Sequence, residues 1–288
     1  MTTGEIVRQA FYYARTCRSL WLFGFFVGLA SGGSNGGGGG GGGKGGGASV
    51  GVGGVSIGGP LDFSVEEVAV IAIVAIVVVV VFTVLRFIGE GALIEGVVRV
   101  RNGGTMTTGE GFRAGWTHWG VLLRIALLYF AATIGSVAAL VVPCVIALFA
   151  LGPLGGILLG IPALFIAVPW LVTLYLVQAF AMRIAVLENR RALDAIAKAR
   201  LFLHGRLIHG LKLLVAAFVG TLGIVLAGIV AIAPVALVLV ALIPVLSLFP
   251  VFVLACLVLL PATYVFAAIL GTFRSSVWTI GYVTQVES

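Results

Sequence analysis

The feature that most constrains the fold of this chain is the length of its uncharged apolar blocks. Residues 125–182 form a run of 58 residues without one Asp, Glu, Lys or Arg, and residues 68–85 form a second, shorter block. A membrane-crossing helix needs about 20 apolar residues, so the longer block is too long for a single crossing. Only 9% of the 288 residues are charged, against about 25% in soluble domains. The sequence therefore predicts an all-α, polytopic integral membrane protein.

Six segments are predicted to cross the membrane. They are residues 20–30, 68–88, 121–149, 157–181, 213–240 and 246–272. The first is the shortest, because its eleven residues cover about 17 Å of helix against a hydrocarbon core of about 30 Å. We expect this crossing to begin nearer Ala10, with Arg15 and Arg18 reaching back to the headgroups.

The basic residues give the predicted orientation. If all six segments cross, 16 of the 17 Lys and Arg residues lie on one face, which the positive-inside rule makes cytoplasmic. If the first segment did not cross, its three preceding arginines would lie opposite the other thirteen. The sequence thus predicts one multi-pass domain, residues 1–288, in the cell (inner or plasma) membrane. Both termini are cytoplasmic in this prediction, as are two interfacial helical links, residues 89–120 and 183–212.

A glycine-rich stretch lies between the first two segments. Residues 32–60 contain 18 glycines among 29 residues, and the predicted orientation makes them a flexible extracytoplasmic loop. Gly38 to Lys44 fits part of the phosphate-loop pattern, but Gly45 occupies the position of the Ser or Thr that would hold magnesium. The stretch is therefore interpreted as a tether and not as a nucleotide site.

Two stretches, "TTGEIVRQAF" at 2–11 and "TTGEGFRAGW" at 107–116, are near copies of one another. Each places a threonine three residues before a glutamate, the pattern of a helix capping box. Both are therefore predicted to begin amphipathic helices on the cytoplasmic side.

A third amphipathic helix is predicted to begin near Asn189. Its apolar positions are Leu193, Ile196, Ala199 and Leu203. Asp194 and Lys198 have the i,i+4 spacing of a favourable charge pair. Each of the three helices precedes two crossings, so we expect a six-helix bundle in three pseudo-repeats. Each repeat is a cytoplasmic amphipathic helix followed by a transmembrane hairpin.

Basic residues at the cytoplasmic face form the predicted binding surface. Each Lys or Arg near an anionic membrane surface contributes about 1 kcal/mol. The residues predicted to bind anionic lipid or a protein partner are Arg99, Arg101, Arg113, Arg190, Arg191, Lys198, Arg200 and Arg206. Glu90, Glu95 and Glu188 lie near arginines in sequence and are predicted to form structural ion pairs.

Features of an enzyme or a metal site are absent from the sequence patterns. The three cysteines are scattered, His204 and His209 do not share a helical face, and no catalytic triad or carboxylate pair can be assembled. We expect no catalytic residues, no metal, no cofactor and no nucleic-acid partner.

Prolines and polar residues within the crossings leave a second function open. Pro143, Pro153, Pro162 and Pro169 mark segments three and four, and four more mark segments five and six. Such prolines free backbone carbonyls and can line a cavity. The polar residues at membrane depth are Thr83, Thr133, Ser136, Thr173, Tyr175, Gln178, Thr221, Ser247 and Tyr264. A transporter or permease component with a path along segments three to six is therefore the alternative.

Three stretches resemble a known family. They are "LWLFGF" at 20–25, "GALIEGVVRVRNGGTMTTGEGFRAGW" at 91–116 and "AMRIAVLENRRALDAIAKARLFLHG" at 181–205. They resemble the multi-helix membrane domain associated with bacterial glycerophosphoryl diester phosphodiesterases and with related uncharacterised membrane proteins. The resemblance implies a six-helix bundle with interfacial helices. It does not imply phosphodiesterase activity, because the soluble barrel with its metal-binding His and Glu set has no counterpart here.

The sequence as a whole predicts a non-enzymatic membrane protein that organises or binds lipid or partner proteins at the cytoplasmic face. Anionic membrane lipids are the expected partners, together with a protein partner or a second copy of the chain.

Overall fold

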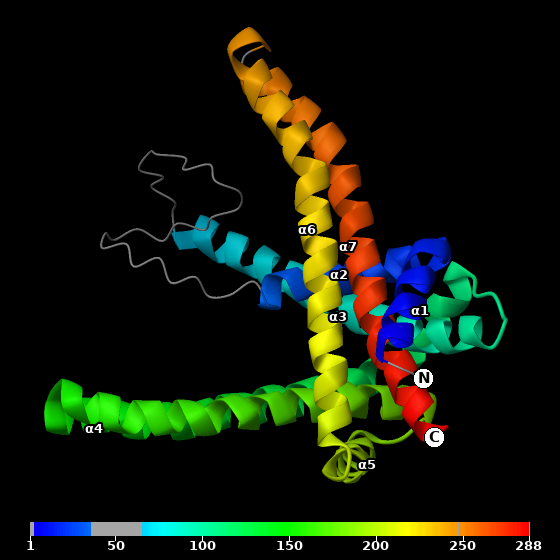
Figure 1. The fold of residues 1–288 in the computed structure, drawn as a ribbon. Coiled ribbons are helices and arrows are strands. Elements are labelled where there is room, and N and C mark those ends of the chain that lie inside the picture. The colour runs from blue at the N-terminus through cyan, green and yellow to red at the C-terminus, as the bar shows by residue number, and fades with distance from the viewer. Residues whose placement is uncertain (1–2, 36–64, 247, 288) are drawn as a thin grey trace.

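The computed structural model of the protein describes residues 3–35, 65–246 and 248–287, and within these ranges it contains helices and no strand. The elements in chain order are α1 (Thr3–Thr16), the 3₁₀ turn η1 (Arg18–Leu20), α2 (Trp21–Asn35), α3 (Val65–Arg101), α4 (Thr108–Leu187), α5 (Ala192–His204), α6 (Leu207–Leu246) and α7 (Leu248–Val286) (Figure 1). The predicted all-α fold is confirmed.

Five stretches of the described chain are long and apolar enough to cross a membrane. They are Ala69–Arg101, Thr108–Ala150, Gly152–Leu187, Leu207–Leu242 and Phe249–Val286. This helical, apolar architecture is that of an integral membrane protein. The first predicted crossing falls in α2, whose 15 residues extend only about 22 Å, less than the hydrocarbon core. The six crossings and three pseudo-repeats remain predictions.

The long α4 is a helical hairpin. Its helix is interrupted at Gly152, which has φ 69° and ψ −165°, a backbone conformation that glycine adopts far more readily than other residues. Trp170 Nε1 donates a hydrogen bond to Ser136 Oγ at 3.0 Å, whereas a straight helix would separate these residues by about 50 Å. The predicted segments 121–149 and 157–181 are therefore the two antiparallel arms of one hairpin.

All helices meet in one region, which we call the base: residues 3–27, 86–126, 171–217 and 268–287. The α4 hairpin and the α6–α7 pair leave the base in different directions, and the described ends of the chain, in α1 and after α7, lie in it (Figure 1). Large buried side chains concentrate there, including Trp278, Phe180 and Leu93, each at most 2% exposed. The base is thus the packed core of the described structure.

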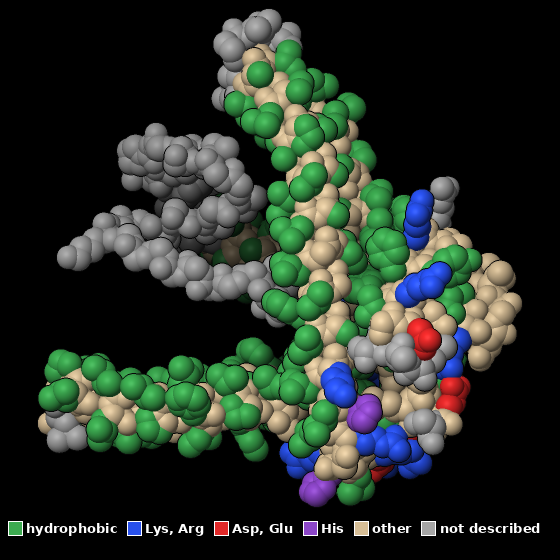
Figure 2. Space-filling view, in the orientation of Figure 1, with side chains coloured by type: hydrophobic (Ala, Val, Ile, Leu, Met, Phe, Trp, Pro, Cys, Tyr) green, Lys and Arg blue, Asp and Glu red, His purple; other side chains and the backbone are tan. Residues whose placement is uncertain are grey.

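The arms that leave the base are apolar on all sides. Phe149, Leu154 and Phe165 are 85%, 79% and 76% exposed, and residues 69–85, 127–170, 218–246 and 249–267 contain no charged residue. The charged side chains gather on the base (Figure 2). Helices that are apolar all round fit lipid, because their backbone groups bond internally.

Glycines bring α2 very close to α7. A Cβ on Gly24 would collide with the Ala268 carbonyl oxygen, and one on Gly28 would collide with the Ala267 carbonyl. From the other side, a Cβ on Gly271 would collide with the Gly24 carbonyl. This is the small-residue packing by which helices associate in membranes. The short α2 is therefore held by close contact with α7.

Several local predictions can be compared with the structure. Thr107 and Glu110 form the predicted capping box, with Glu110 Oε2 accepting from the Thr107 N–H at 3.0 Å. Thr2 of the first predicted box lies outside the described residues, as does the predicted loop beyond Asn35. The α2 helix continues through Asn35, five residues past the predicted end at residue 30.

The third amphipathic helix begins later than predicted. Asn189 has a positive φ of 49° and lies in the turn that precedes α5. The buried residues of α5 are Ala195, Ala199 and Leu203, whereas Leu193 is 70% exposed. The predicted apolar face is therefore displaced by about half a turn at its start.

Candidate functional site

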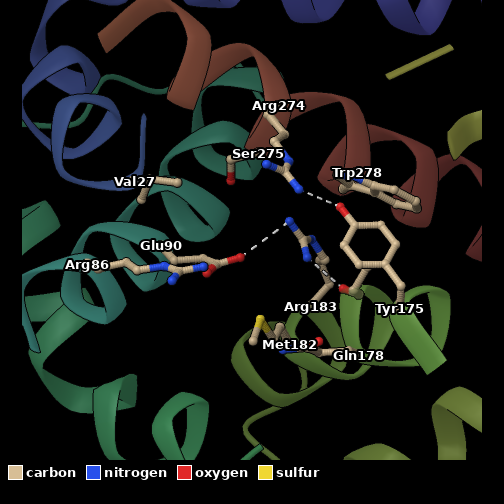
Figure 3. Close-up of a pocket in the computed structure, with 11 residues that line it drawn as sticks. Val27, Arg86, Glu90, Tyr175, Gln178, Met182, Arg183, Arg274, Ser275 and Trp278 are labelled. Carbon is tan, nitrogen blue, oxygen red and sulfur yellow. Dashed lines mark hydrogen bonds and ion pairs between the residues drawn. The ribbon is translucent and has the colours of Figure 1, made fainter. Parts of the chain in front are cut away.

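The candidate site is a cavity of about 260 Å³ inside the base, where α2, α3, the second arm of α4 and α7 meet. Its charged lining residues are Arg86 and Glu90 of α3, Arg183 of α4 and Arg274 of α7. Three positive charges less one negative charge leave +2 when all four groups are ionised. Tyr175, Gln178, Ser275 and Trp278 complete the polar and aromatic part of the lining (Figure 3).

Arg183 lies at the centre of this arrangement. Its Nη2 is 3.6 Å from Glu90 Oε1 and its Nη1 donates to the Ala179 carbonyl at 2.7 Å. The Arg183 side chain is only 5% exposed, and its Nε has no hydrogen-bond partner among the described residues. A guanidinium carries five N–H donors, and a buried donor without a partner costs about 1–3 kcal/mol. One carboxylate therefore does not satisfy this arginine.

The other two arginines approach the same space from different helices. Arg274 Nη2 donates to the Tyr175 hydroxyl at 2.7 Å, and the guanidinium groups of Arg183 and Arg274 point into the region between α4 and α7 (Figure 3). Arg86 lies beside Glu90, and its buried Nε has no partner in the described part of the chain. Arg86 of α3 and Arg183 of α4 thus line the same cavity, and each has a buried Nε without a partner among the described residues.

Spacing along each helix explains how the side chains come together. Arg86 and Glu90 are four residues apart on α3, and Arg274 and Trp278 are four apart on α7, so each pair shares a helical face. Arg183 is four residues, about one helical turn, from the C-terminal end of α4. The three helices cross at the base and direct these faces toward one another.

The arrangement is suited to binding an anion. Arginine presents a planar fork of donors that matches the oxygens of carboxylate and phosphate groups. Inside a protein the low local dielectric strengthens both the attraction for an anion and the repulsion among unneutralised arginines. A single glutamate balances one of the three arginines, so an anion with several oxygens would satisfy the remaining donors.

The eight basic residues predicted as a binding surface are spread over the base, and five of them contact other parts of the protein. Arg99 lies 3.4 Å from Glu110, Arg101 2.5 Å from Glu287, Arg190 3.5 Å from Glu188 and Lys198 2.6 Å from Glu188. Arg206 donates to the Gln285 carbonyl at 2.7 Å. Arg113, Arg191 and Arg200 are exposed, and none has an ion pair within the described ranges.

Glu188 joins α4, α5 and α7. Lys198 Nζ donates to its carboxylate at 2.6 and 2.7 Å, and the Tyr282 hydroxyl donates at 2.9 Å. Partial burial acts to raise the pKa of Glu188, but the hydrogen bonds from Lys198 and Tyr282 and the charges of Lys198 and Arg190 outweigh it and lower the pKa below its ordinary value. Lys198 therefore pairs with Glu188 instead of the helical neighbour Asp194.

The other two predicted acids differ in their surroundings. Glu90 pairs with Arg183, as described above. Glu95 is half-buried and has no basic group within 4.0 Å among the residues that the structure describes.

The sequence prediction did not identify the three arginines of the cavity as a site. The sequence does contain a signal for this site. Arg86, Arg183 and Arg274 each border or interrupt a long apolar stretch, and a charged residue in such a place usually has a function. Tyr175 and Gln178, which were considered only as polar residues at depth, also line the cavity. Which distant arginines converge depends on how the helices pack.

Comparisons of the chain with protein-family models, with curated proteins and with solved structures find no match. The resemblance to the membrane domain associated with bacterial phosphodiesterases therefore stays a prediction.

Proposed function

We propose that this chain is a non-enzymatic integral membrane protein that binds the anionic headgroup of a membrane lipid at its base. The observation that carries the proposal is the convergence of Arg86, Arg183 and Arg274 on a cavity that holds one acid, Glu90. The phosphate oxygens of a lipid headgroup would supply the acceptors that Glu90 alone does not.

The cavity and the exposed basic residues are expected to bind anionic lipid with different strengths. An exposed basic residue contributes about 1 kcal/mol near an anionic membrane. A hydrogen bond to a charged group in a protein interior contributes about 1.5–3 kcal/mol. Three such bonds in the cavity, about 4.5–9 kcal/mol, would outweigh the attraction of the exposed residues Arg113, Arg191 and Arg200, about 3 kcal/mol together. The surface then attracts anionic lipid in general, and the cavity retains one molecule.

The position of the base supports a lipid as the source of the anion. The charged residues lie where the apolar arms begin (Figure 2), and that boundary corresponds to the headgroup region if the arms cross the membrane. In this proposal the base faces the cytoplasm, consistent with its excess of basic residues.

A transporter or permease component is the alternative function. The α4 hairpin and the α6–α7 pair diverge from the base (Figure 1), an arrangement that does not favour a path enclosed by both. Lipid binding requires only the packed base.

Lipid binding can be tested by native mass spectrometry of the detergent-purified protein with added phosphatidylglycerol or zwitterionic phosphatidylcholine. We expect the wild type to retain phosphatidylglycerol, and the double variant Arg86→Gln/Arg274→Gln to bind it at least about tenfold more weakly, which is about 1.4 kcal/mol. The matched control is Arg113→Gln/Arg200→Gln, which removes the same charge from exposed positions. Equal losses in the two variants would contradict a headgroup site in the cavity.

A further inference from the structure

A second cavity adjoins the arginine cavity and differs from it in chemistry. It has a volume of about 360 Å³ and lies between the second arm of α4, α6 and α7. Its apolar lining includes Leu171, Val172, Leu214, Ala217 and Phe218. Tyr175, Arg274 and Trp278 line both cavities. The two cavities therefore adjoin at these three side chains, two of which, Tyr175 and Arg274, are joined by a hydrogen bond.

We propose that the two cavities form one site for an anionic glycerophospholipid, with its phosphate in the arginine cavity and one acyl chain in the apolar cavity. The inference rests on the proposed function and goes further, because it names the class of ligand. A free phosphate, or a lipid held by its headgroup alone, would use only the first cavity.

The residues shared by the two cavities have the chemistry of a boundary. Tyr175 bonds Arg274 through its hydroxyl at 2.7 Å and presents its ring to Trp278, whose centroid lies 5.9 Å away. Arginine, tyrosine and tryptophan each combine an apolar body with a polar end. Such side chains fit the glycerol region of a phospholipid, where the charged and apolar parts of the molecule meet.

Size and access agree with a two-part ligand. Pockets for small ligands typically enclose about 300–1,000 Å³, and the arginine cavity at about 260 Å³ is smaller than this range. The two cavities together fall within it. Phe218 lines the apolar cavity and is 67% exposed, so this cavity opens to the outside of the molecule. A chain could therefore enter between α4 and α6 directly from the bilayer.

The test uses the wild-type protein and a phosphatidylglycerol that carries a photoreactive diazirine near the end of one acyl chain. After irradiation, peptide mass spectrometry identifies the labelled residues. We expect labelling of Leu214 or Phe218, at least fivefold above that of exposed arm residues such as Phe149. Labelling confined to the arms would overturn the proposal.

The headgroup variant shows whether the two cavities hold one molecule. In Arg86→Gln/Arg274→Gln, the labelling of Leu214 and Phe218 should fall at least fivefold, while that of Phe149 stays unchanged. Unchanged labelling of all three residues would mean that the chain enters without a headgroup anchor, which contradicts a two-part site.

Variants that fill the apolar cavity test the acyl-chain site separately from the anion site. Thr221→Phe, or Ala217→Leu as a second variant, places a larger side chain in the apolar cavity, and Leu222→Phe on the same helix is the control. We expect the filled variants to lose retained phosphatidylglycerol while inorganic phosphate still raises their unfolding temperature, relative to chloride at equal ionic strength. Full retention of the lipid would refute the acyl site and leave the anion site intact. If phosphate stabilised Arg86→Gln/Arg274→Gln as much as the wild type, both proposals would fail.

Discussion

Arg183 and Glu90 connect the second arm of α4 to α3 through an ion pair of 3.6 Å, with side chains that are 5% and 13% exposed. The pair is buried in the base, where removing one partner leaves the other charge without compensation. Losses of this kind cost about 3–5 kcal/mol. Arg99 and Glu110 form a pair of similar length, 3.4 Å, with side chains 46% and 47% exposed. The two pairs therefore allow a matched comparison of burial.

We predict that Arg183→Met and Glu90→Gln each lower the unfolding temperature in detergent, and that the double variant loses less than the sum of the two. The coupling should reach about 1–3 kcal/mol, because neither charge is left unpaired in the double variant. The same cycle on Arg99→Met and Glu110→Gln should give less than about 1 kcal/mol. Additive losses at the buried pair would show that Glu90 does not compensate Arg183.

The glycines of α2 and α7 give a second prediction. Gly28→Ala places a Cβ against the Ala267 carbonyl, which belongs to the backbone and cannot rotate away. We expect a loss of at least about 1–3 kcal/mol, the usual range for overpacking. Gly223→Ala on α6 is the control, because a Cβ there meets no atom within 4 Å. Thermal unfolding of the two variants in the same detergent measures the difference, and equal stability would argue against close packing of α2 on α7.

Gly152 gives a third prediction, which isolates backbone conformation. Its φ is 69°, and a Cβ there would meet no atom within 4 Å. Gly152→Ala should therefore destabilise the α4 hairpin through backbone strain alone, by about 1–3 kcal/mol. Gly135→Ala, also in open space on α4, should leave stability unchanged or raise it. If both variants unfold at the same temperature, the turn does not require a glycine at Gly152.

A fourth prediction concerns pH. The pKa of Glu188 is lower in the folded protein than its ordinary value, which is about 4.3 in an unfolded chain. A lowered pKa gives stability that is fully present above the unfolded value and is lost as the pH falls through the folded value. Wild type should therefore exceed Glu188→Gln in unfolding temperature at neutral pH.

This difference should shrink once the pH falls below about 4. Unfolding curves of wild type and Glu188→Gln at pH 7 and at successively lower pH measure this difference. Tyr282→Phe removes one hydrogen bond to Glu188, so its unfolding temperature should also lie below that of the wild type at neutral pH, by a smaller amount. A difference that stays constant with pH would mean that the charge of Glu188 contributes nothing to stability.

Much of the architecture follows from local sequence patterns. The uncharged block of residues 125–182 predicted two crossings, and the structure folds it into the α4 hairpin. The capping box of Thr107 and Glu110 depends on residues three apart, so it could also be predicted. The end of α2 was predicted five residues too early. This helix packs against α7, where Gly28 meets the distant Ala267, and no local pattern contains that contact.

The candidate site depends on contacts that no local pattern contains. Arg86, Arg183 and Arg274 are each about ninety residues or more from the next and meet only because three helices pack together. Lys198 is a further example, since its i,i+4 spacing predicted an ion pair with Asp194. The turn between α4 and α5 brings Glu188 within 2.6 Å instead. The charge pattern predicted basic residues that bind anionic lipid or a protein partner at the cytoplasmic face, whereas helix packing determines which arginines line the cavity.

The most direct test of the central claim is an experimental density map of the protein in nanodiscs that contain phosphatidylglycerol. We expect non-protein density in the cavity of the base, with a phosphate within about 3 Å of the guanidinium nitrogens of Arg183 and Arg274. A cavity without lipid density, with headgroups ordered only at Arg113, Arg191 or Arg200, would contradict the account.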